Sequence, residues 1–228
     1  MDLVEIDPVD RFIDSLEGEL LLRKRELTNV WFYSAQEDNT LKKESLLRNN
    51  VLIIYAHWEG FIKSSSIKYL KYICKREIPC QLLTINFKAL HIKKISKGTT
   101  DKPEWERFLE IADQNFNDVF MVKAEFVIDT ESNLKSEVLN KIIKTLNVSE
   151  FRLADNILKL LDNGLLSDRN AIAHGEMKKV PLIHVQSYHE LILELLESYK
   201  DKLIDMVISE FYLAPPMEEV IVSEIITP

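Results

Sequence analysis

Arg169 and His174 are separated by four residues in the stretch "SDRNAIAHGEM", residues 167–177. If this stretch is helical, Asn170 and His174 share one face, and the long side chain of Arg169 reaches the same patch. A histidine can move a proton near neutral pH, and a guanidinium can grip two phosphate oxygens. Together they suit metal-free RNA cleavage, in which one group moves the proton of the 2'-hydroxyl or the leaving 5'-oxygen while a fixed cation stabilises the phosphate.

A simpler interpretation of the same pair stays open. A histidine at the C-terminal end of a helix is favoured by the helix dipole, and an exposed arginine needs no special role. Short arginine-to-histidine spacings are also common by chance, so spacing alone favours this simpler interpretation. The elements that position the pair therefore matter.

Helical periodicity dominates the first third of the chain. Asp7 followed by Pro8 is typical of a helix N-terminus, and this helix is expected to reach about residue 37. A longer helix is expected over residues 41–75, before Pro79, because its apolar residues alternate steps of four and three: Leu47, Val51, Ile54, Trp58 and Phe61.

Residues 81–131 are less regular and are expected to form an elaboration between the second long helix and the helices that carry the motif. Within them, "FMVKAEFVI" (120–128) is rich in β-branched and aromatic residues and is predicted as a strand, although it has no obvious strand to pair with.

The helical pattern returns after residue 132, and one helix is expected to stop at Asn163-Gly164. Ser167 or Asp168 is then expected to cap the short helix that carries the motif, and Gly175 is expected to end it.

A last long helix is expected over residues 185–212, followed by a C-terminal tail over 214–228. No repeat or Gly/Ser-rich linker divides the chain of 228 residues. We therefore expect one all-α domain over residues 1–213.

The charge is distributed unevenly. The chain carries a net charge of -8, yet the stretch 63–97 has nine basic residues and one acidic residue, or +8, so the remainder carries -16. With Tyr69, Tyr72 and Phe87 interleaved, this stretch suits single-stranded RNA. A solvated helix face, or a face that receives an acidic antitoxin, is the alternative. The candidate RNA-binding residues are Lys63, Lys68, Lys71, Lys75 and Arg76.

Other chemistries leave no pattern in the sequence. There is no phosphate-binding loop, no HExxH and no GxSxG, and the histidines and cysteines lack metal-ligand spacing, so neither a metal nor a cofactor is expected. Cys74 and Cys80 are expected to be reduced. The sequence has no secretion signal and no apolar run long enough to cross a membrane, so a cytoplasmic location without membrane association is expected.

Two polar residues of the second helix have alternative interpretations. Glu59 precedes Lys63 by four residues, the favourable order for a helical ion pair. His57 is predicted to point away from Trp58 and could reach the motif helix, although a hydrogen-bonded core histidine is more frequent. The tryptophans are expected in the core: Trp31, Trp58 and Trp105.

The stretch "RNAIAHGE" resembles the R-x4-H signature of the HEPN superfamily. A second stretch, "LIIYAHWEGFIK" (52–63), is similar to the Tyr-Ala-His-Trp-Glu-Gly-Phe helix of a bacterial HEPN branch related to the RiboL-PSP group, found in toxin–antitoxin and phage-defence loci. The two stretches lie in the expected order. The resemblance is clear over residues 41–75 and 132–205 and thin between 80 and 130.

This resemblance implies an all-α, up-and-down HEPN helical bundle that forms a homodimer, with two copies of the motif across one groove. It implies a metal-independent endoribonuclease that acts as a toxin or abortive-infection effector, with RNA and a possible cognate antitoxin as partners. Arg169 matches the phosphate-binding arginine, Asn170 the polar residue after it and His174 the catalytic histidine, while Glu59 matches a supporting glutamate.

Two alternatives belong to other classes of function. One is a HEPN module that binds RNA, nucleotide or a partner protein without cutting. The other is a helical partner subunit for a nucleotidyltransferase. Because the resemblance is thin between residues 80 and 130, it leaves in doubt which substrate the protein acts on, but not the type of reaction.

Overall fold

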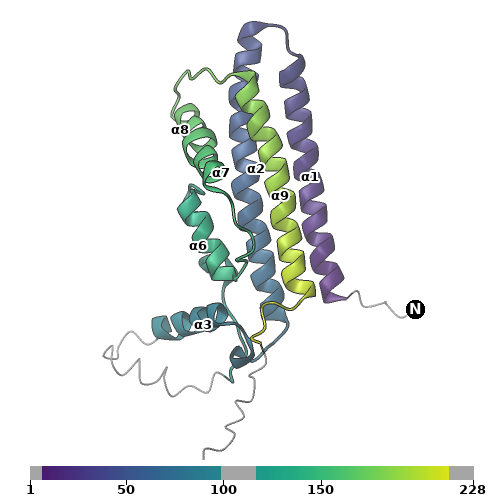
Figure 1. Ribbon diagram of the computed structural model, residues 1–228, viewed down its shortest axis with the longest axis vertical. Coiled ribbons are helices and arrows are strands. Elements are labelled where there is room, and N and C mark those ends of the chain that lie inside the picture. The colour runs from purple at the N-terminus through teal and green to yellow at the C-terminus, as the bar shows by residue number, and fades with distance from the viewer. Residues whose placement is uncertain (1–6, 99–116, 216–228) are drawn as a thin grey trace, which may run out of the picture.

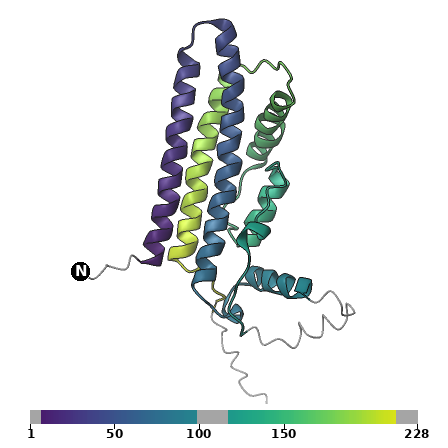
Figure 2. The ribbon, with the colours of Figure 1, turned by 180° about the vertical axis from the view of Figure 1, so that it is seen from behind.

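Three long helices form the frame of the protein (Figure 1). The computed structural model describes residues 7–98 and 117–215. Helix α1 (Pro8–Gln36) packs against α2 (Thr40–Lys75) and α9 (Leu182–Ile208), and α2 and α9 also pack against each other. Helices α2 and α9 run in the same direction, opposite to α1 (Figures 1 and 2). Every regular element of the described residues is helical, which confirms the predicted all-α fold.

The starts of the first two helices follow from local capping. Asp7 accepts a hydrogen bond from the backbone N–H of Val9 at 2.7 Å, and Pro8 occupies the first turn, as predicted. Asn39 caps α2 in the same way, because its side chain accepts from the N–H of Lys42 at 3.1 Å. The long apolar stripe of α2 is buried, and Trp58 is only 1% exposed.

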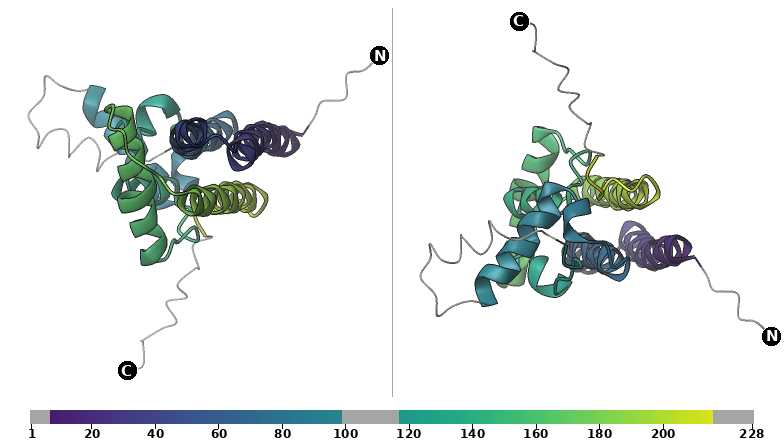
Figure 3. Two further views of the ribbon diagram at one scale, coloured as in Figure 1. Left: turned by 90° about the horizontal axis from the view of Figure 1, so that it is seen from above. Right: turned by 90° about the horizontal axis from the view of Figure 1, so that it is seen from below.

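A second layer of shorter helices covers α2 and α9 on the side away from α1 (Figure 3). It contains α6 (Ser136–Leu146), α7 (Asp155–Lys159), a π-helical turn over Leu160–Leu166, and α8 (Ser167–Ala173). The last three form one continuous helical run.

The predicted stop at Asn163-Gly164 and the predicted cap at Ser167 or Asp168 are therefore wrong. No side-chain capping bond begins α8. Gly164 serves close packing instead, because a Cβ atom there would lie 3.0 Å from the hydroxyl of Tyr188. Gly164 itself lies within the π-helical turn.

The middle segment contains a 3-10 turn (Cys80–Leu82), α3 (Ile85–Gly98) and the short α5 (Ala124–Val127). The predicted strand over residues 120–128 is wrong. Phe120, Ala124 and Ile128, spaced by four, are all buried. Their apolar side chains face the helical core, and the segment makes no ladder with another strand of the described chain beyond isolated bridges.

The buried side chains form one hydrophobic core. Trp58 lies within it, Trp31 is partly buried and stacks on His189, and Trp105 lies outside the described residues. Cys74 and Cys80 are buried and unbridged. None of the described helices is long and apolar enough to cross a membrane. Residues 216–228, most of the expected tail, also lie outside the described part.

Candidate active site around Arg169

Arg169 extends from α8 to the middle of α2. The centre of its guanidinium lies 4.2 Å from the centroid of the Tyr55 ring, and Nη2 lies 3.6 Å from Oε2 of Glu59. Tyr55 and Glu59 are four residues apart and so share one face of α2. The Arg169 side chain is 23% exposed and that of Glu59 is 19% exposed, so the pair is half-buried but open to a ligand.

Two neutral amides hold one end of the guanidinium. Nη1 of Arg169 donates to Oδ1 of Asn133 at 2.9 Å and to Oδ1 of Asn170 at 2.7 Å. The contacts of Nη2 with the carbonyl of Ser132, at 3.4 Å, and with Glu59 are longer. No bond to Nε is found within the described residues. The Nε–Nη2 edge is therefore the part of Arg169 best placed to accept an oxyanion.

The loop 129–134 connects α5 to α6 and supplies most of these contacts. Its Thr130 hydroxyl donates to Oε1 of Glu59 at 2.7 Å, and the N–H of Leu134 donates to the Tyr55 hydroxyl at 2.6 Å. Glu131 and Ser132 both have positive φ, 53° and 62°. Non-glycine residues in this conformation cost conformational energy and recur at functional sites.

The chemistry of Tyr55 suits a neutral platform. Burial raises the pKa of its hydroxyl well above the ordinary value, and the negative charge of Glu59 raises this pKa further. A tyrosine hydroxyl is uncharged at neutral pH even at its ordinary pKa of 10.0, so the ring is neutral and its face can attract the guanidinium of Arg169.

His174 ends α8. Its N–H donates to the carbonyl of Asn170 at 3.0 Å, so the two residues lie one turn apart on the same face, as predicted. Gly175 has φ of +86° and ends the helix, also as predicted. The N–H groups of Gly175 and Glu176 donate to carbonyls of the preceding turn, which is a Schellman motif. The imidazole is exposed, and among the described residues no hydrogen bond or ion pair joins it to Arg169.

A buried carboxylate anchors the segment around His174. Asp168 is 7% exposed, accepts a hydrogen bond from the Tyr188 hydroxyl at 3.0 Å, and forms an ion pair of 2.6 Å with Lys178. Lys179 pairs with Glu44 at 3.2 Å. The two lysines tie the loop that follows His174 to α8 and α2, and the Tyr188 bond joins α8 to α9.

His57 does not contact the motif helix. Its Nε2 lies 3.2 Å from Glu26 and its Nδ1 lies 3.3 Å from Arg23, both on α1. Burial lowers the pKa of His57, with the positive charge of Arg23 acting in the same direction and Glu26 opposing it. The prediction that His57 could reach the motif is wrong, because its position on α2 faces α1. Glu59 likewise turns toward Arg169 and Thr130 rather than pairing with Lys63.

The five candidate RNA-binding residues lie beyond Glu59, in the C-terminal part of α2 and at its C-cap Arg76, and three of them are in ion pairs. Lys68 pairs with Glu19 at 2.8 Å, Lys71 with Glu125 at 2.5 Å and Arg76 with Glu210 at 3.7 Å. No such pair is found for Lys63 or Lys75 within the described residues.

The interleaved rings do not suit base stacking. Tyr69 and Phe87 are fully buried and Tyr72 is 7% exposed, because they face the core on the apolar sides of α2 and α3. The prediction that they stack on RNA bases is wrong. An RNA-binding role of the five basic residues stays a prediction.

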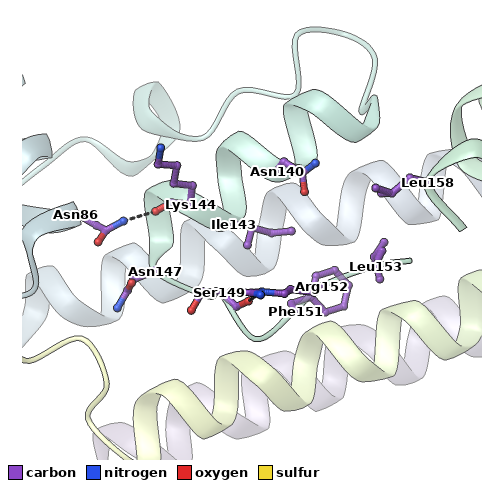
Figure 4. Close-up of a pocket in the computed structure, with 10 residues that line it drawn as sticks. All are labelled: Asn86, Asn140, Ile143, Lys144, Asn147, Ser149, Phe151, Arg152, Leu153 and Leu158. Carbon is purple, nitrogen blue, oxygen red and sulfur yellow. Dashed lines mark hydrogen bonds between the residues drawn. The ribbon is translucent and has the colours of Figure 1, made fainter. Parts of the chain in front are cut away.

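Neither Arg169 nor His174 belongs to the cavity shown in Figure 4, which has a volume of about 390 Å³. This cavity lies at the other end of α6, where the Asn86 side-chain amide donates to the carbonyl of Lys144. The candidate active site is thus a surface site, with an arginine and a histidine on adjacent turns. No group of three potential metal ligands occurs in the described part of the chain.

Three features missed by sequence reasoning build the site: Tyr55 as a platform, Asn133 as an acceptor and Thr130 as a partner of Glu59. Tyr55 stands four residues before Glu59, a spacing that could have shown their common face. Thr130 and Asn133 carry no such signal in the sequence.

Comparison of the sequence with known proteins assigns the chain to a family. No match was found among curated proteins or among solved structures. A sequence model described as RiboL-PSP-HEPN matches residues 19–205. The match covers most of α1 and α9 and everything between them. It therefore includes both parts of the candidate site, which are Tyr55 and Glu59 on α2 and Arg169 and His174 on α8 and at its end. This chain therefore belongs to the RiboL-PSP-HEPN family.

Proposed function

We propose that the protein is a metal-independent endoribonuclease of the HEPN type. The observation that carries the proposal is the way Arg169 is held. Neutral amides of Asn133 and Asn170 occupy its Nη1, and the ring of Tyr55 fixes its plane. Among the described residues Nε has no partner and Nη2 has only the longer contacts with Glu59 and the carbonyl of Ser132, so this edge is the part of Arg169 that can receive a phosphate. The exposed His174 follows five residues later, at the end of α8.

In the proposed mechanism, the arginine stabilises the negative charge that builds on the phosphate oxygens. His174 acts as base or acid at the same phosphate. The 2'-oxygen loses its proton and bonds to phosphorus, the bond from phosphorus to the 5'-oxygen breaks, and that oxygen gains a proton. The products are a 2',3'-cyclic phosphate and a 5'-hydroxyl.

Within the described part of one chain no hydrogen bond or ion pair joins Arg169 to His174, and a homodimer would bring two copies of the motif together. The loop that follows α8 leads to the end of the bundle at which α2 and α9 begin (Figure 1), and apolar side chains are exposed in these three segments. Met177 is 78% exposed, Ile183 is 62% exposed and Leu41 is 79% exposed. Exposed apolar side chains near a functional group favour an interface, here one that faces two motifs across one groove.

The biological setting we propose is a cytoplasmic toxin or abortive-infection effector, held in check by a cognate antitoxin. The support is family membership and the uneven charge. Lys63, one turn beyond Glu59 on α2, is the first of the five candidate basic residues after Glu59 and the first candidate for guiding RNA.

The test is cleavage of end-labelled RNA in EDTA by the wild type, Arg169→Ala and His174→Ala. His184→Ala removes an exposed histidine in the first turn of α9 and is the matched control. We expect the wild type and His184→Ala to leave cyclic phosphates, and the two motif variants to leave the RNA intact while keeping the thermal midpoint. Cleavage that survives both motif substitutions would rule out this assignment.

The alternative is a HEPN module that binds RNA, nucleotide or a partner without cutting. One observation favours it. Arg169 already contacts the side chains of four residues of its own chain and the backbone carbonyl of a fifth, Ser132, as a structural arginine would. Sedimentation decides between the two. A structural role predicts that Arg169→Ala changes the oligomeric state, whereas a catalytic role predicts that only cleavage is lost.

A further inference from the structure

A second concave site adjoins the loop that holds Arg169. A cavity of about 830 Å³ opens between α3, α5 and α6, and its wall includes Asp129 and Glu131 of the loop 129–134. Small-molecule sites are typically roughly 300–1,000 Å³ in volume. The cavity is therefore large enough for a small ligand, and it contains neither Arg169 nor His174.

The cavity offers an aromatic surface with a cation beside it. Phe126 is 82% exposed and Met121 is 48% exposed, although both are large apolar side chains. The ammonium of Lys123 lies 5.8 Å from the centroid of the Phe126 ring. A flat ring of a ligand could stack on Phe126 while an anionic group meets the lysine.

The charged groups on the wall favour an anion. The lysines Lys93, Lys94, Lys123 and Lys141 face two carboxylates, Asp129 and Glu131, so the wall carries four positive and two negative charges, a net +2. Glu131 and Lys141 pair with each other at 2.8 Å. Carboxylates on a net positive wall can accept hydrogen bonds from sugar hydroxyls without repelling phosphate.

We propose that this cavity binds a nucleoside phosphate. The base stacks on Phe126, the ribose hydroxyls donate to Asp129, and the phosphates lie among the lysines. Apolar surface, carboxylate and excess positive charge match the three parts of such a ligand in one site, whereas an apolar molecule or an inorganic anion would use only one of them.

The same loop places this ligand beside the active site. Residues of this one loop serve both sites. Asp129 and Glu131 line the cavity, whereas Thr130 bonds to Glu59 and Asn133 bonds to Arg169. Asp129, the proposed partner of the ribose, also accepts a hydrogen bond of 2.9 Å from the N–H of Glu131, a residue with positive φ that precedes Ser132, whose carbonyl contacts Arg169. Occupation of the cavity therefore biases how the guanidinium is held.

The binding experiment uses the fluorescent N-methylanthraniloyl derivative of ATP in EDTA, with displacement by unlabelled ATP. The double variant Lys94→Gln/Lys123→Gln removes two charges of the wall, and Thr145→Trp fills the cavity from α6 without removing a core side chain. The matched control is Lys42→Gln/Lys43→Gln at the far end of α2. Arg169→Ala tests whether the nucleotide sits at the catalytic arginine instead.

We expect saturable binding that weakens at least about tenfold in Lys94→Gln/Lys123→Gln, disappears in Thr145→Trp, and persists in the control and in Arg169→Ala. Tripolyphosphate alone should displace the probe only at much higher concentration than ATP. Failure of the wild type to bind, equal binding by all variants, or loss in Arg169→Ala would each overturn the site. If Thr145→Trp fails to fold, comparison of Lys94→Gln/Lys123→Gln with Lys42→Gln/Lys43→Gln decides whether the nucleotide binds in this cavity.

The link to the active site is measured without RNA. Saturating ATP should slow hydrogen exchange of the Leu134 N–H, which bonds to Tyr55, in the wild type but not in Thr145→Trp. Unchanged exchange despite binding would overturn the link and leave the site. Because neither measurement uses cleavage, a failure here is distinguishable from a failure of the proposed ribonuclease function.

Discussion

Asn133 and Arg169 are 36 residues apart in the sequence, yet the side-chain oxygen of Asn133 accepts a hydrogen bond of 2.9 Å from Nη1 of Arg169. The asparagine belongs to a loop with two successive positive-φ residues, and the arginine to the motif helix. A neutral acceptor orients the guanidinium without cancelling its charge. The loop is therefore part of the site rather than a connection between helices.

Substitution of Asn133 by alanine should loosen Arg169 without unfolding the protein. Loss of one orienting hydrogen bond to a charged group is expected to lower kcat for RNA cleavage about tenfold, or about 1.4 kcal/mol, with a smaller change in KM. Asn140→Ala, an exposed asparagine on α6, is the control for a general effect. An unchanged kcat in Asn133→Ala would show that Asn170 and Tyr55 suffice.

Removal of the Tyr55 hydroxyl should affect stability more than chemistry. In Tyr55→Phe the ring remains under the guanidinium, but the buried N–H of Leu134 loses its acceptor, at a cost of about 1–3 kcal/mol in the free energy of unfolding. Tyr55→Leu also loses the ring and should lower cleavage further. Urea unfolding of both variants, beside their cleavage rates, separates the two contributions; equal cleavage rates would contradict a role for the ring.

Two glycines should respond oppositely to alanine. In Gly164→Ala the new methyl group would lie 3.0 Å from the Tyr188 hydroxyl and 3.1 Å from Leu160, so overpacking should cost about 1–3 kcal/mol and disturb the bond from Tyr188 to Asp168. Gly18→Ala meets nothing within 4 Å in α1 and should stabilise the protein by about 0.5–1 kcal/mol. Urea midpoints that move in the same direction would contradict this account.

Stability should fall as the pH drops below neutrality, partly through His189. Burial lowers the pKa of this histidine below its ordinary 6.5, so the folded state keeps it neutral while the unfolded chain takes up a proton. Its contribution is complete above pH 6.5 and declines as the pH falls from there toward the folded pKa. His189→Phe should flatten the dependence of the unfolding free energy on pH below pH 6.5. An unaltered slope would contradict the prediction.

A separate acid transition is expected from Glu19. Its pKa is lowered, because hydrogen bonds from Lys68, Ser64 and Arg23 outweigh the opposing effect of burial. A carboxylate with a lowered pKa stabilises the fold above its ordinary value of 4.5, and this contribution is lost as the pH falls further through the folded pKa. Glu19→Gln should therefore change the slope below pH 4.5 and leave the histidine range unchanged.

The sequence by itself determined the features that depend on near neighbours in the chain. Periodicity and caps predicted α1, α2 and α9 to within a few residues, and Gly175 marked the end of α8. The two stretches that resemble HEPN proteins identified the family, and the spacing of Asn170 and His174 predicted their common face. All of these follow from the geometry of a single helix, which is set by residues three or four positions apart.

Only the tertiary structure decided which groups surround Arg169 and which aromatic side chains are available to a ligand. Thr130 lies 71 residues from Glu59 in the sequence, and His57 proved to face α1 rather than the motif. Tyr69 lies among lysines in the sequence but inside the core in the fold. Gly164 likewise lies within a continuous helical run, closely packed against Tyr188, rather than at a helix end. These features depend on contacts between distant segments, and such contacts leave no periodic pattern along the chain because they form only when the helices pack.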